Sequence, residues 1–187
     1  NINEVEQTDE SNPSDRKLIT TSDGSHTLYI PAMDEQYHSV NGAITESMHI
    51  FIEKGLKSIQ KKEIRIFEVG FGTGLNAFLT WLTSREKGIT ISYYTVEKYP
   101  LEEKLFTSLN YPELLSPHDL SFFLELHTSP WEKDRLIGEH FTLHKIQSDI
   151  NVCPIPSAID LVYFDAFAPN KQAGIWSQEL FDKLYSQ

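Results

Sequence analysis

The spacing of apolar and polar positions changes along the chain, and each change predicts a different element of secondary structure. Residues 17–21 and 26–30 are short stretches with apolar side chains, and they flank a polar segment, residues 22–25, that includes Gly24. Glycine tolerates a positive φ angle in a tight turn, so this pattern predicts a β-hairpin whose second strand ends at Pro31. Residues 41–59 place apolar side chains at three- and four-residue steps, which predicts a helix: Ile44, Met48, Phe51, Ile52, Leu56 and Ile59.

From residue 63 onwards, predicted strands alternate with predicted helices. Strands are expected at residues 64–69, 89–96, 141–147 and 159–164, and helices from 75 to about 86, from 102 to 109 and from 176 or 177 onwards. Residues 111–140 are rich in proline, histidine and aromatic residues, and we expect irregular structure there with one short helix. The alternation predicts an α/β fold with a doubly wound, mostly parallel sheet and right-handed crossovers.

Composition and pattern divide the chain into three regions. Residues 1–15 contain five acidic residues, no basic residue and no apolar stretch, which predicts a disordered acidic tail rather than a signal peptide. Residues 16–62 hold the hairpin and the first helix, and residues 63–187 hold the alternating part. No apolar run approaches the roughly 18 residues of a membrane helix. With a single cysteine, Cys153, the chain has no internal disulfide, and we expect a cytoplasmic protein.

The strongest chemical signal is a glycine-rich turn between the first strand of the alternating part and the helix after it. Gly70, Gly72 and Gly74 form a G-x-G-x-G pattern, and such glycines let a ligand approach the backbone of a tight turn. A dinucleotide fingerprint would need glycine at position 75, which is leucine, and no GK[ST] sequence for phosphate binding follows. The spacing is typical of an S-adenosylmethionine site, and a glycine turn in some other α/β protein is the alternative.

Acidic residues stand at the ends of four successive predicted strands. Ligands of open α/β sheets bind at the carboxyl ends of the strands, and an acidic residue after the second strand accepts hydrogen bonds from a ribose diol. Glu97 occupies that position, 23 residues after Gly74. Capping of a helix is the alternative role for Asp149. We expect the four carboxylates to face one crevice: Glu68, Glu97, Asp149 and Asp165.

Charge and histidine spacing limit the choice of partners. The net charge of −11 argues mildly against a nucleic-acid partner, because neutralisation of phosphates supplies much of the affinity for RNA and DNA. The densest basic cluster also suits the end of a predicted helix, where cations interact well with the helix dipole. The seven histidines and one cysteine show no HExxH or CxxC spacing, so we predict no metal site. The basic cluster consists of Lys54, Lys57, Lys61, Lys62 and Arg65.

Several segments resemble the methyltransferase domain of the MnmC family, which acts in the biosynthesis of 5-methylaminomethyl-2-thiouridine in tRNA. Residues 67–76 resemble the glycine loop of the family, and residues 97–100 resemble the end of its second strand. Asp165–Pro169, with Trp176 downstream, is similar to its "DAFAP … W" signature, the most specific of these segments. Residues 37–43, with Glu46, look like the segment that leads into this domain, and the similarity extends over residues 18–187.

The resemblance implies a class I methyltransferase fold, S-adenosylmethionine as cofactor, and methyl transfer to the aminomethyl nitrogen of the wobble uridine in tRNA. Glu97 would bind the ribose, and Asp149 would lie beside the adenine. Asp165 would be the catalytic residue, facing the acceptor amine to orient it or to take up its proton. Tyr37 and Ser39 would help to close the site. The methionine part of the cofactor would be held by Glu68, Gly70, Gly72, Gly74 and Asn76.

Two features differ from the pattern of the family. Its bifunctional members carry an additional flavin-dependent oxidase domain, for which 187 residues leave no room, so we expect no FAD. The class I fold has seven strands, whereas the parallel series here has four, so we expect the C-terminal strands to be missing. The apolar strand at 159–164 would then have an open edge that promotes association with another chain. Two alternatives remain for the function, namely a class I methyltransferase of a small molecule or protein, and a non-catalytic cofactor-binding partner subunit.

Overall fold

The structure is a computed structural model that describes residues 15–165 together with residues 182, 184 and 186. Three subjects of the sequence predictions lie outside these residues: the acidic tail apart from Asp15, the Ala166–Pro169 part of the DAFAP block, and Trp176. Asp182 and Leu184, which belong to the expected final helix, are helical.

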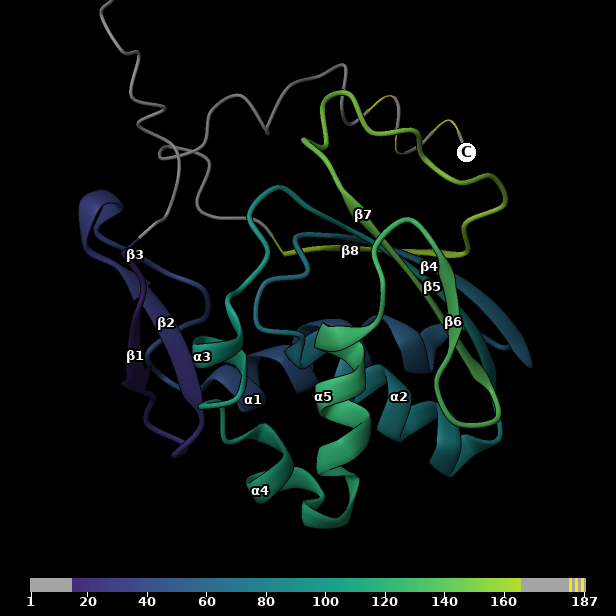
Figure 1. The fold of residues 1–187 in the computed structure, drawn as a ribbon. Helices are drawn as coiled ribbons and strands as arrows, with labels where there is room; N and C mark the ends of the chain where they lie inside the picture. The colour runs from purple at the N-terminus through teal and green to yellow at the C-terminus, as the bar shows by residue number, and fades with distance from the viewer. Residues whose placement is uncertain (1–14, 166–181, 183, 185, 187) are drawn as a thin grey trace, which may run out of the picture.

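A five-stranded sheet forms the centre of the described chain (Figure 1), in the order β6-β7-β5-β4-β8. β4 pairs in parallel with β5 and β8, and β5 pairs in parallel with β7, as predicted. β6 runs antiparallel to β7 at one edge of the sheet. The strands are β4 (Glu63–Val69), β5 (Thr90–Glu97), β6 (Asp134–Leu136), β7 (Phe141–Gln147) and β8 (Leu161–Phe164).

The four residues that end β4, 66–69, are all buried, as expected for a central strand of a parallel sheet that is covered on both faces. Ile66 and Phe67 are adjacent in the sequence and both fully buried, yet they belong to different hydrophobic clusters. Successive side chains of a strand point to opposite faces, so each face of the sheet has its own apolar cover. Figure 1 shows α1, α2 and α5 on one face of the sheet, where Ile66 packs.

The predicted hairpin is confirmed as β1 (Lys17–Thr20) and β2 (His26–Ile30), which pair antiparallel, with Gly24 at a φ of 86° in the turn. Pro31 ends β2 and begins a 3-10 turn, η1 (Pro31–Met33). A third strand that we did not predict, β3 (Glu35–Gln36), pairs with the other side of β2. Two residues are too short to show an alternating pattern, so the sequence carries no signal for this strand.

The helix expected over residues 41–59 is broken into three parts. α1 (Ala43–Ser47) continues into a π-helical segment, η2 (Met48–Glu53), and a 3-10 turn follows at η3 (Leu56–Ser58). The break comes at Gly55, where a β-carbon would lie only 2.5 Å from the carbonyl oxygen of Phe51. Apolar spacing reports which side chains are buried, but it does not distinguish between helix types.

Residues 111–140 are more ordered than we expected, and the prediction of irregular structure with one short helix is wrong. α3 (Glu103–Phe106) is followed by α4 (Tyr111–Leu115), a 3-10 turn η4 (Pro117–Asp119), and α5 (Leu120–Thr128). Helices this short are held by tertiary contacts rather than by their own propensity. The Tyr111 hydroxyl, for example, donates to the carbonyl oxygen of His26 at 2.8 Å and so fastens α4 to the N-terminal hairpin.

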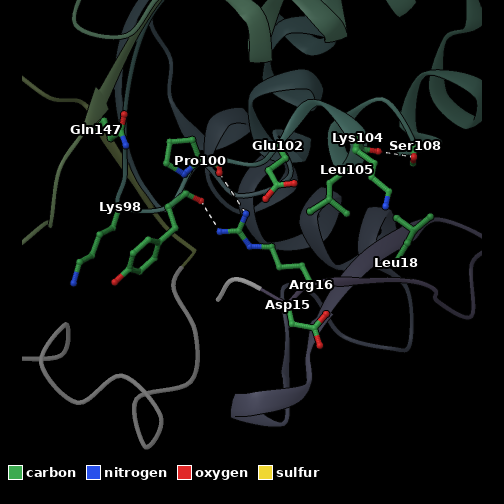
Figure 2. Close-up of a pocket in the computed structure, with 11 residues that line it drawn as sticks. Asp15, Arg16, Leu18, Lys98, Pro100, Glu102, Lys104, Leu105, Ser108 and Gln147 are labelled. Carbon is green, nitrogen blue, oxygen red and sulfur yellow. Dashed lines mark hydrogen bonds between the residues drawn. The ribbon is translucent and has the colours of Figure 1, made fainter. Parts of the chain in front are cut away.

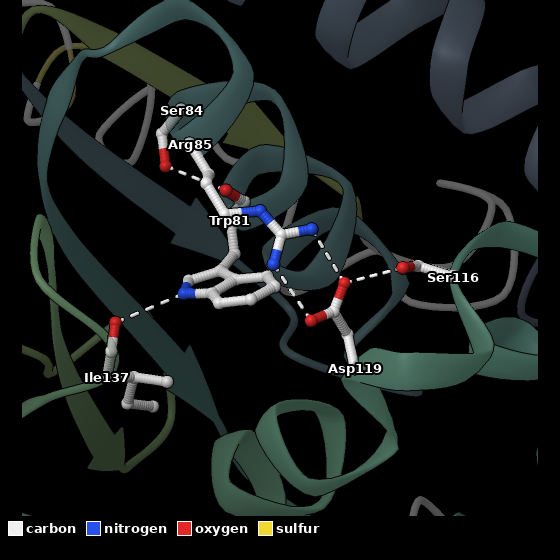
Figure 3. Close-up of polar contacts among 6 residues, drawn as sticks. All are labelled: Trp81, Ser84, Arg85, Ser116, Asp119 and Ile137. Carbon is white, nitrogen blue, oxygen red and sulfur yellow. Dashed lines mark hydrogen bonds and ion pairs between the residues drawn. The ribbon is translucent and has the colours of Figure 1, made fainter.

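A second set of tertiary contacts joins α2 (Leu75–Lys87) to η4 and to the segment after β6 (Figure 3). The Arg85 guanidinium lies 4.5 Å from the Trp81 ring centroid and donates to both Asp119 carboxylate oxygens, at 2.8 and 2.6 Å. The Trp81 indole donates to the Ile137 carbonyl oxygen at 3.1 Å. Planar, two-point contacts of this kind fix orientation as well as position, and they hold α5 against α2.

Candidate active site

The glycine-rich turn joins β4 to α2, as predicted, and its three glycines all have positive φ angles. These angles are 90° at Gly70, 52° at Gly72 and 76° at Gly74, a region that other residues rarely adopt. Gly74 is the N-cap of α2, and a β-carbon there would lie 2.8 Å from the His127 Nε2 atom. The turn therefore needs glycine both for its backbone angles and for space. We call residues 70–74 the glycine loop.

Side chains from α5 and β7 pack against the glycine loop. The pKa of His127 is lowered to about 3 by burial, so the ring is neutral and its Nε2–H donates to the Thr73 carbonyl oxygen at 2.9 Å. Lys145 is fully buried, donates to the His127 carbonyl oxygen at 2.6 Å, and lies 4.5 Å from the Trp131 ring centroid. Burial lowers the pKa of Lys145 to about 8. Sequence analysis missed His127 and Lys145 because both come from segments far from the loop in the chain.

Glu97 lies beside the glycine loop, as predicted. One carboxylate oxygen accepts a hydrogen bond of 2.9 Å from the Gly72 amide, and the other accepts one of 3.0 Å from the Tyr99 amide. Burial raises the pKa of Glu97, and these amides and the nearby Arg16 charge oppose the rise. Glu97 is a half-buried residue at the carboxyl end of β5.

Asp149 follows β7 at the same edge of the sheet. Its carboxylate accepts from the backbone amide of Asn151 at 2.9 Å, which is a local turn contact, and lies 3.5 Å from the Lys98 ammonium. The end of β7 meets the end of β5, because the Ser148 amide donates to the Glu97 carbonyl oxygen at 3.2 Å. The structure therefore brings Asp149 and Glu97 to one edge, while the local turn also gives Asp149 a structural role.

Asp165 follows β8, and the Asn76 side chain connects it to the first turn of α2. The Asn76 Nδ2 atom donates to the Asp165 carboxylate at 2.9 Å, and Asn76 itself is buried. Burial raises the pKa of Asp165 to about 7, with further contributions from the charges of Glu46 and Glu97, whereas the Asn76 contact opposes the rise. Glu68, near the end of β4, is fully buried and accepts a hydrogen bond from the Thr95 hydroxyl at 2.8 Å.

Tyr37 covers the glycine loop, whereas Ser39 belongs to the turn before α1. The Tyr37 ring is so close to Gly72 that a β-carbon there would lie 3.1 Å from Cδ2. Burial and the negative charge of Glu97 raise the pKa of Tyr37. The Ser39 hydroxyl accepts from the Asn41 amide at 3.1 Å.

An open cleft of about 620 Å³ lies beside the turn that follows Glu97 (Figure 2). One wall is formed by Asp15, Arg16 and Leu18. Arg16 donates from this wall to the Tyr99 carbonyl oxygen at 2.8 Å and to that of Pro100 at 3.3 Å. Lys98 and Lys104 also line the cleft, together with the acidic side chains of residues 15 and 102. Three basic and two acidic side chains therefore line this cleft, beside the turn that follows Glu97.

The described ranges contain neither a membrane-spanning helix nor a metal-binding group of side chains. No helix there is long and apolar enough to cross a membrane. No group of three or more His, Cys, Asp or Glu side chains in the same residues could hold a metal ion.

Comparison with known proteins points to one family. A family model described as S-adenosyl-L-methionine-dependent methyltransferase matches residues 130–187. Two tRNA 5-methylaminomethyl-2-thiouridine biosynthesis bifunctional proteins MnmC are each 31% identical to this chain. The match to the protein from Pseudomonas entomophila (strain L48) covers 81% of this chain and 25% of the relative. The match to the protein from Campylobacter fetus subsp. fetus (strain 82-40) covers 84% and 26%.

A solved structure agrees with these matches. The crystal structure of MnmC2 from Aquifex aeolicus has a TM-score of 0.72 and 30% sequence identity, and the match covers 92% of this chain and 56% of that one. The chain spans about a quarter of the length of the curated relatives. The mostly parallel sheet, the glycine loop and these similarities agree, and we conclude that the chain is an S-adenosylmethionine-dependent methyltransferase domain homologous to the methyltransferase portion of MnmC proteins.

Proposed function

We propose that this domain methylates the aminomethyl nitrogen of a modified wobble uridine in tRNA, in the cytoplasm. The names of the related proteins supply the product, 5-methylaminomethyl-2-thiouridine of tRNA, and its aminomethyl precursor would be the substrate. The observation that carries the proposal is the hydrogen bond of 2.9 Å from Asn76, which ties the Asp165 carboxylate to the first turn of α2, directly after the glycine loop. An acidic group with a pKa of about 7 therefore stands next to the predicted cofactor site.

The residues around the glycine loop fit S-adenosylmethionine. The loop presents backbone without β-carbons at the N-terminus of α2, where free N–H groups favour a carboxylate. Glu97 offers carboxylate oxygens to the ribose hydroxyls, and Asp149 would lie beside the adenine. The loop glycines would hold the methionine part of the cofactor, and Glu68 and Asn76 would border its end nearest to Asp165.

The chemistry required of the protein is limited. When bound, S-adenosylmethionine supplies a methyl group that is already activated on a sulfonium sulfur. The acceptor amine attacks only when it is neutral, so its alignment and its protonation state decide the rate. Asp165 would orient the amine and accept the proton that the nitrogen loses as its bond to the methyl carbon forms. A carboxylate whose pKa is about 7 suits this task, because a general base works best near the ambient pH.

The cleft beside Glu97 would contact the RNA. The whole chain is acidic, with a net charge of −11, so favourable contacts with phosphates require a local group of cations. Arg16, Lys98 and Lys104 line the cleft, and Lys104 is exposed. Asp15 and Glu102 also line the cleft and Lys98 lies 3.5 Å from Asp149, so Lys104 is the cation of this group on which the proposed RNA contact depends most.

Calorimetry with S-adenosylmethionine, followed by methyl transfer to undermodified tRNA, tests the proposal. Cofactor binding together with methylated uridine in the tRNA is the expected result. Cofactor binding with transfer only to a small molecule or protein would favour a different acceptor. Binding without transfer to any acceptor would identify a cofactor-binding partner subunit.

A further inference from the structure

Arg16 connects the N-terminal hairpin to the turn that follows Glu97. Its guanidinium donates to the Tyr99 carbonyl oxygen at 2.8 Å and to the Pro100 carbonyl oxygen at 3.3 Å, the dashed contacts of Figure 2. These partners are 83 and 84 residues away along the chain. Within the described parts of the chain, no carboxylate forms an ion pair with Arg16, and its buried Nε atom has no hydrogen-bond partner. The two carbonyl contacts therefore define where the guanidinium lies.

These contacts restrain the residue whose amide holds Glu97. The Tyr99 amide donates to the Glu97 carboxylate at 3.0 Å, while the Tyr99 carbonyl oxygen accepts from Arg16. The amide and the carbonyl of one residue belong to two different planar peptide groups, so holding both limits φ and ψ of Tyr99. Pro100 has no N–H and brings no backbone donor to the turn. Arg16 supplies two donors from another element instead.

A second side chain from the N-terminal region covers the other backbone segment that donates to Glu97. That segment is the glycine loop, where the Gly72 amide donates to the carboxylate at 2.9 Å. The Tyr37 ring lies so close to Gly72 that an added β-carbon would be 3.1 Å from Cδ2. Arg16 directly precedes β1 and Tyr37 directly follows β3, and both strands pair with β2. One three-stranded sheet therefore contacts both backbone segments that orient Glu97.

The charge of Arg16 also acts on Glu97. Burial raises the pKa of Glu97, and the nearby guanidinium opposes this rise, which favours the ionised form. An ionised carboxylate has about four acceptor sites, so two backbone amides leave lone pairs for hydroxyl groups of a ligand. Tyr37 adds no negative charge here, because burial raises its pKa and keeps the hydroxyl neutral.

We propose that Arg16 is a positioning residue for Glu97, and that it strengthens S-adenosylmethionine binding by holding the turn at residues 99 and 100 so that the carboxylate faces the ribose. The N-terminal hairpin is then part of the cofactor site, although it lies outside the parallel sheet. Arg16 differs in this from Lys104, the proposed RNA contact, because both terminal nitrogens of Arg16 already donate to the protein backbone. The role rests on the proposed function in assigning Glu97 as the ribose ligand.

Calorimetry with S-adenosylmethionine and a double-mutant cycle over positions 16 and 97 tests this role. Arg16→Ala should weaken binding by about fivefold or more. Arg16→Lys should lose less, because lysine keeps the charge and can still donate to one of the two carbonyl oxygens. In a Glu97→Ala background, Arg16→Ala should cost less than about twofold, since a residue that acts through Glu97 then has nothing to position. Equal losses in both backgrounds would overturn the proposal.

Lys17→Ala is the matched control for these measurements. Lys17 is the exposed neighbour of Arg16 at the start of β1, carries the same charge, and does not line the cleft. Its removal should leave the affinity for S-adenosylmethionine at the wild-type value. A loss equal to that of Arg16→Ala would mean that charge or hairpin stability, rather than the contacts of Arg16, supports cofactor binding, and the proposal would be wrong.

Amide hydrogen exchange, followed by NMR on the cofactor-free chain, tests the turn without any ligand. The Tyr99 amide should exchange about tenfold faster or more in Arg16→Ala than in the wild type, because the turn opens locally. The Tyr37 amide, which donates to the Leu28 carbonyl oxygen at 2.9 Å, should keep its rate and so report that the small sheet is intact. An unchanged rate at Tyr99 would contradict the proposal.

Kinetics with undermodified tRNA distinguish positioning from a direct part in the reaction. In Arg16→Ala the KM for S-adenosylmethionine should rise, whereas kcat at saturating cofactor should stay within about twofold of the wild type. If Arg16→Ala instead keeps its cofactor affinity and reduces the salt dependence of tRNA binding, Arg16 is an RNA contact and the proposal is wrong.

The two proposals fail in different ways. A protein that gives the expected double-mutant cycle but methylates no tRNA would contradict the proposed function and leave the role of Arg16 established. A protein that methylates tRNA but loses equal affinity in both backgrounds would contradict only the role of Arg16. Wild-type affinity in Glu97→Ala would remove the ribose assignment and the role of Arg16 together. If Arg16→Ala fails to fold, Arg16→Lys in the same cycle decides, because its smaller loss should also disappear in the Glu97→Ala background.

Discussion

The backbone amide of Gly72 donates a hydrogen bond of 2.9 Å to the Glu97 carboxylate, across 25 residues of sequence. The contact ties the middle of the glycine loop to the carboxyl end of the neighbouring strand. The other oxygen of the same carboxylate accepts from the Tyr99 amide at 3.0 Å. Glu97 therefore shapes two backbone segments in addition to its proposed role as ribose ligand.

Substitution of Glu97 and of Asp165 should separate cofactor binding from catalysis. Glu97→Ala should weaken S-adenosylmethionine binding by about 1–3 kcal/mol, the range for loss of hydrogen bonds to a charged group. Asp165→Ala should leave that affinity mostly intact and lower turnover, since Asp165 is proposed to face the acceptor. Calorimetry and single-turnover methyl transfer measure the two effects, and an equal loss of cofactor affinity in both variants would show that Asp165 has another role.

Gly74 should tolerate alanine less well than a glycine with a similar backbone angle elsewhere. Any alanine at a positive φ costs roughly 1–2 kcal/mol. At Gly74 the β-carbon would also lie 2.8 Å from the His127 Nε2 atom, and overpacking typically adds about 1–3 kcal/mol. Gly88 is the matched control, with a φ of 61° and no atom within 4 Å of an added β-carbon.

Denaturant unfolding of Gly74→Ala and Gly88→Ala measures this difference, and calorimetry measures the effect on the cofactor. Gly74→Ala should lose more stability and most of its affinity for S-adenosylmethionine, whereas Gly88→Ala should keep wild-type affinity. Equal losses of stability in the two variants would mean that His127 does not support the loop as the structure indicates.

The predictable part of the fold was the part with a strong local pattern. The strands predicted at 64–69, 89–96 and 141–147 agree with β4, β5 and β7 to within one residue at each end. β6 could not be predicted in the same way, since all three of its side chains are exposed and show no alternation. α4 and α5 were missed because their stability depends on contacts with α2 and with the hairpin.

The predictable part of the site was the set of residues whose positions follow from the order of the strands. Glu97 and the glycine loop adjoin because neighbouring parallel strands end at one edge of the sheet. No such rule brings His127 beneath the loop or turns the Asn76 amide toward Asp165. Those contacts depend on how side chains pack between segments that are far apart in the sequence. A single sequence carries no signal for such packing.

Buried His38 should make the stability of the fold depend on pH. Burial lowers the pKa of His38 to about 4, and its Nδ1 atom lies 2.9 Å from the Thr27 hydroxyl. The unfolded chain, with a pKa near 6.5, binds the proton more readily, so stability is lost as the pH falls from about 6.5 toward 4. The loss attributable to His38 is on the order of 3 kcal/mol at the low end of this window.

Denaturant unfolding at pH 7.5 and at pH 5 measures the effect of His38, with His38→Gln as the comparison. The variant should be less stable at pH 7.5 but should lose less stability on acidification. Part of the dependence should remain, since the pKa of His127 is also lowered, to about 3. An identical pH dependence in wild type and variant would show that His38 does not titrate in this window.

Lys104 should contribute to RNA binding through the cleft beside Glu97. The residue is exposed on α3 and lines the cleft with Arg16 and Lys98, and it is the one whose removal is least expected to disturb the fold. Each phosphate contact makes binding more sensitive to salt, with a slope of roughly 0.7–0.9 in log affinity against log salt concentration. Lys104→Ala should therefore weaken tRNA binding and reduce that slope by about this amount.

Lys87→Ala is the control, because Lys87 is also exposed at the end of a helix but does not line the cleft. Fluorescence anisotropy with labelled tRNA over a range of salt concentrations measures both variants. Equal slopes for Lys104→Ala and the wild type would place the RNA on another surface, and an unchanged affinity for S-adenosylmethionine would confirm that the substitution acts on the RNA alone.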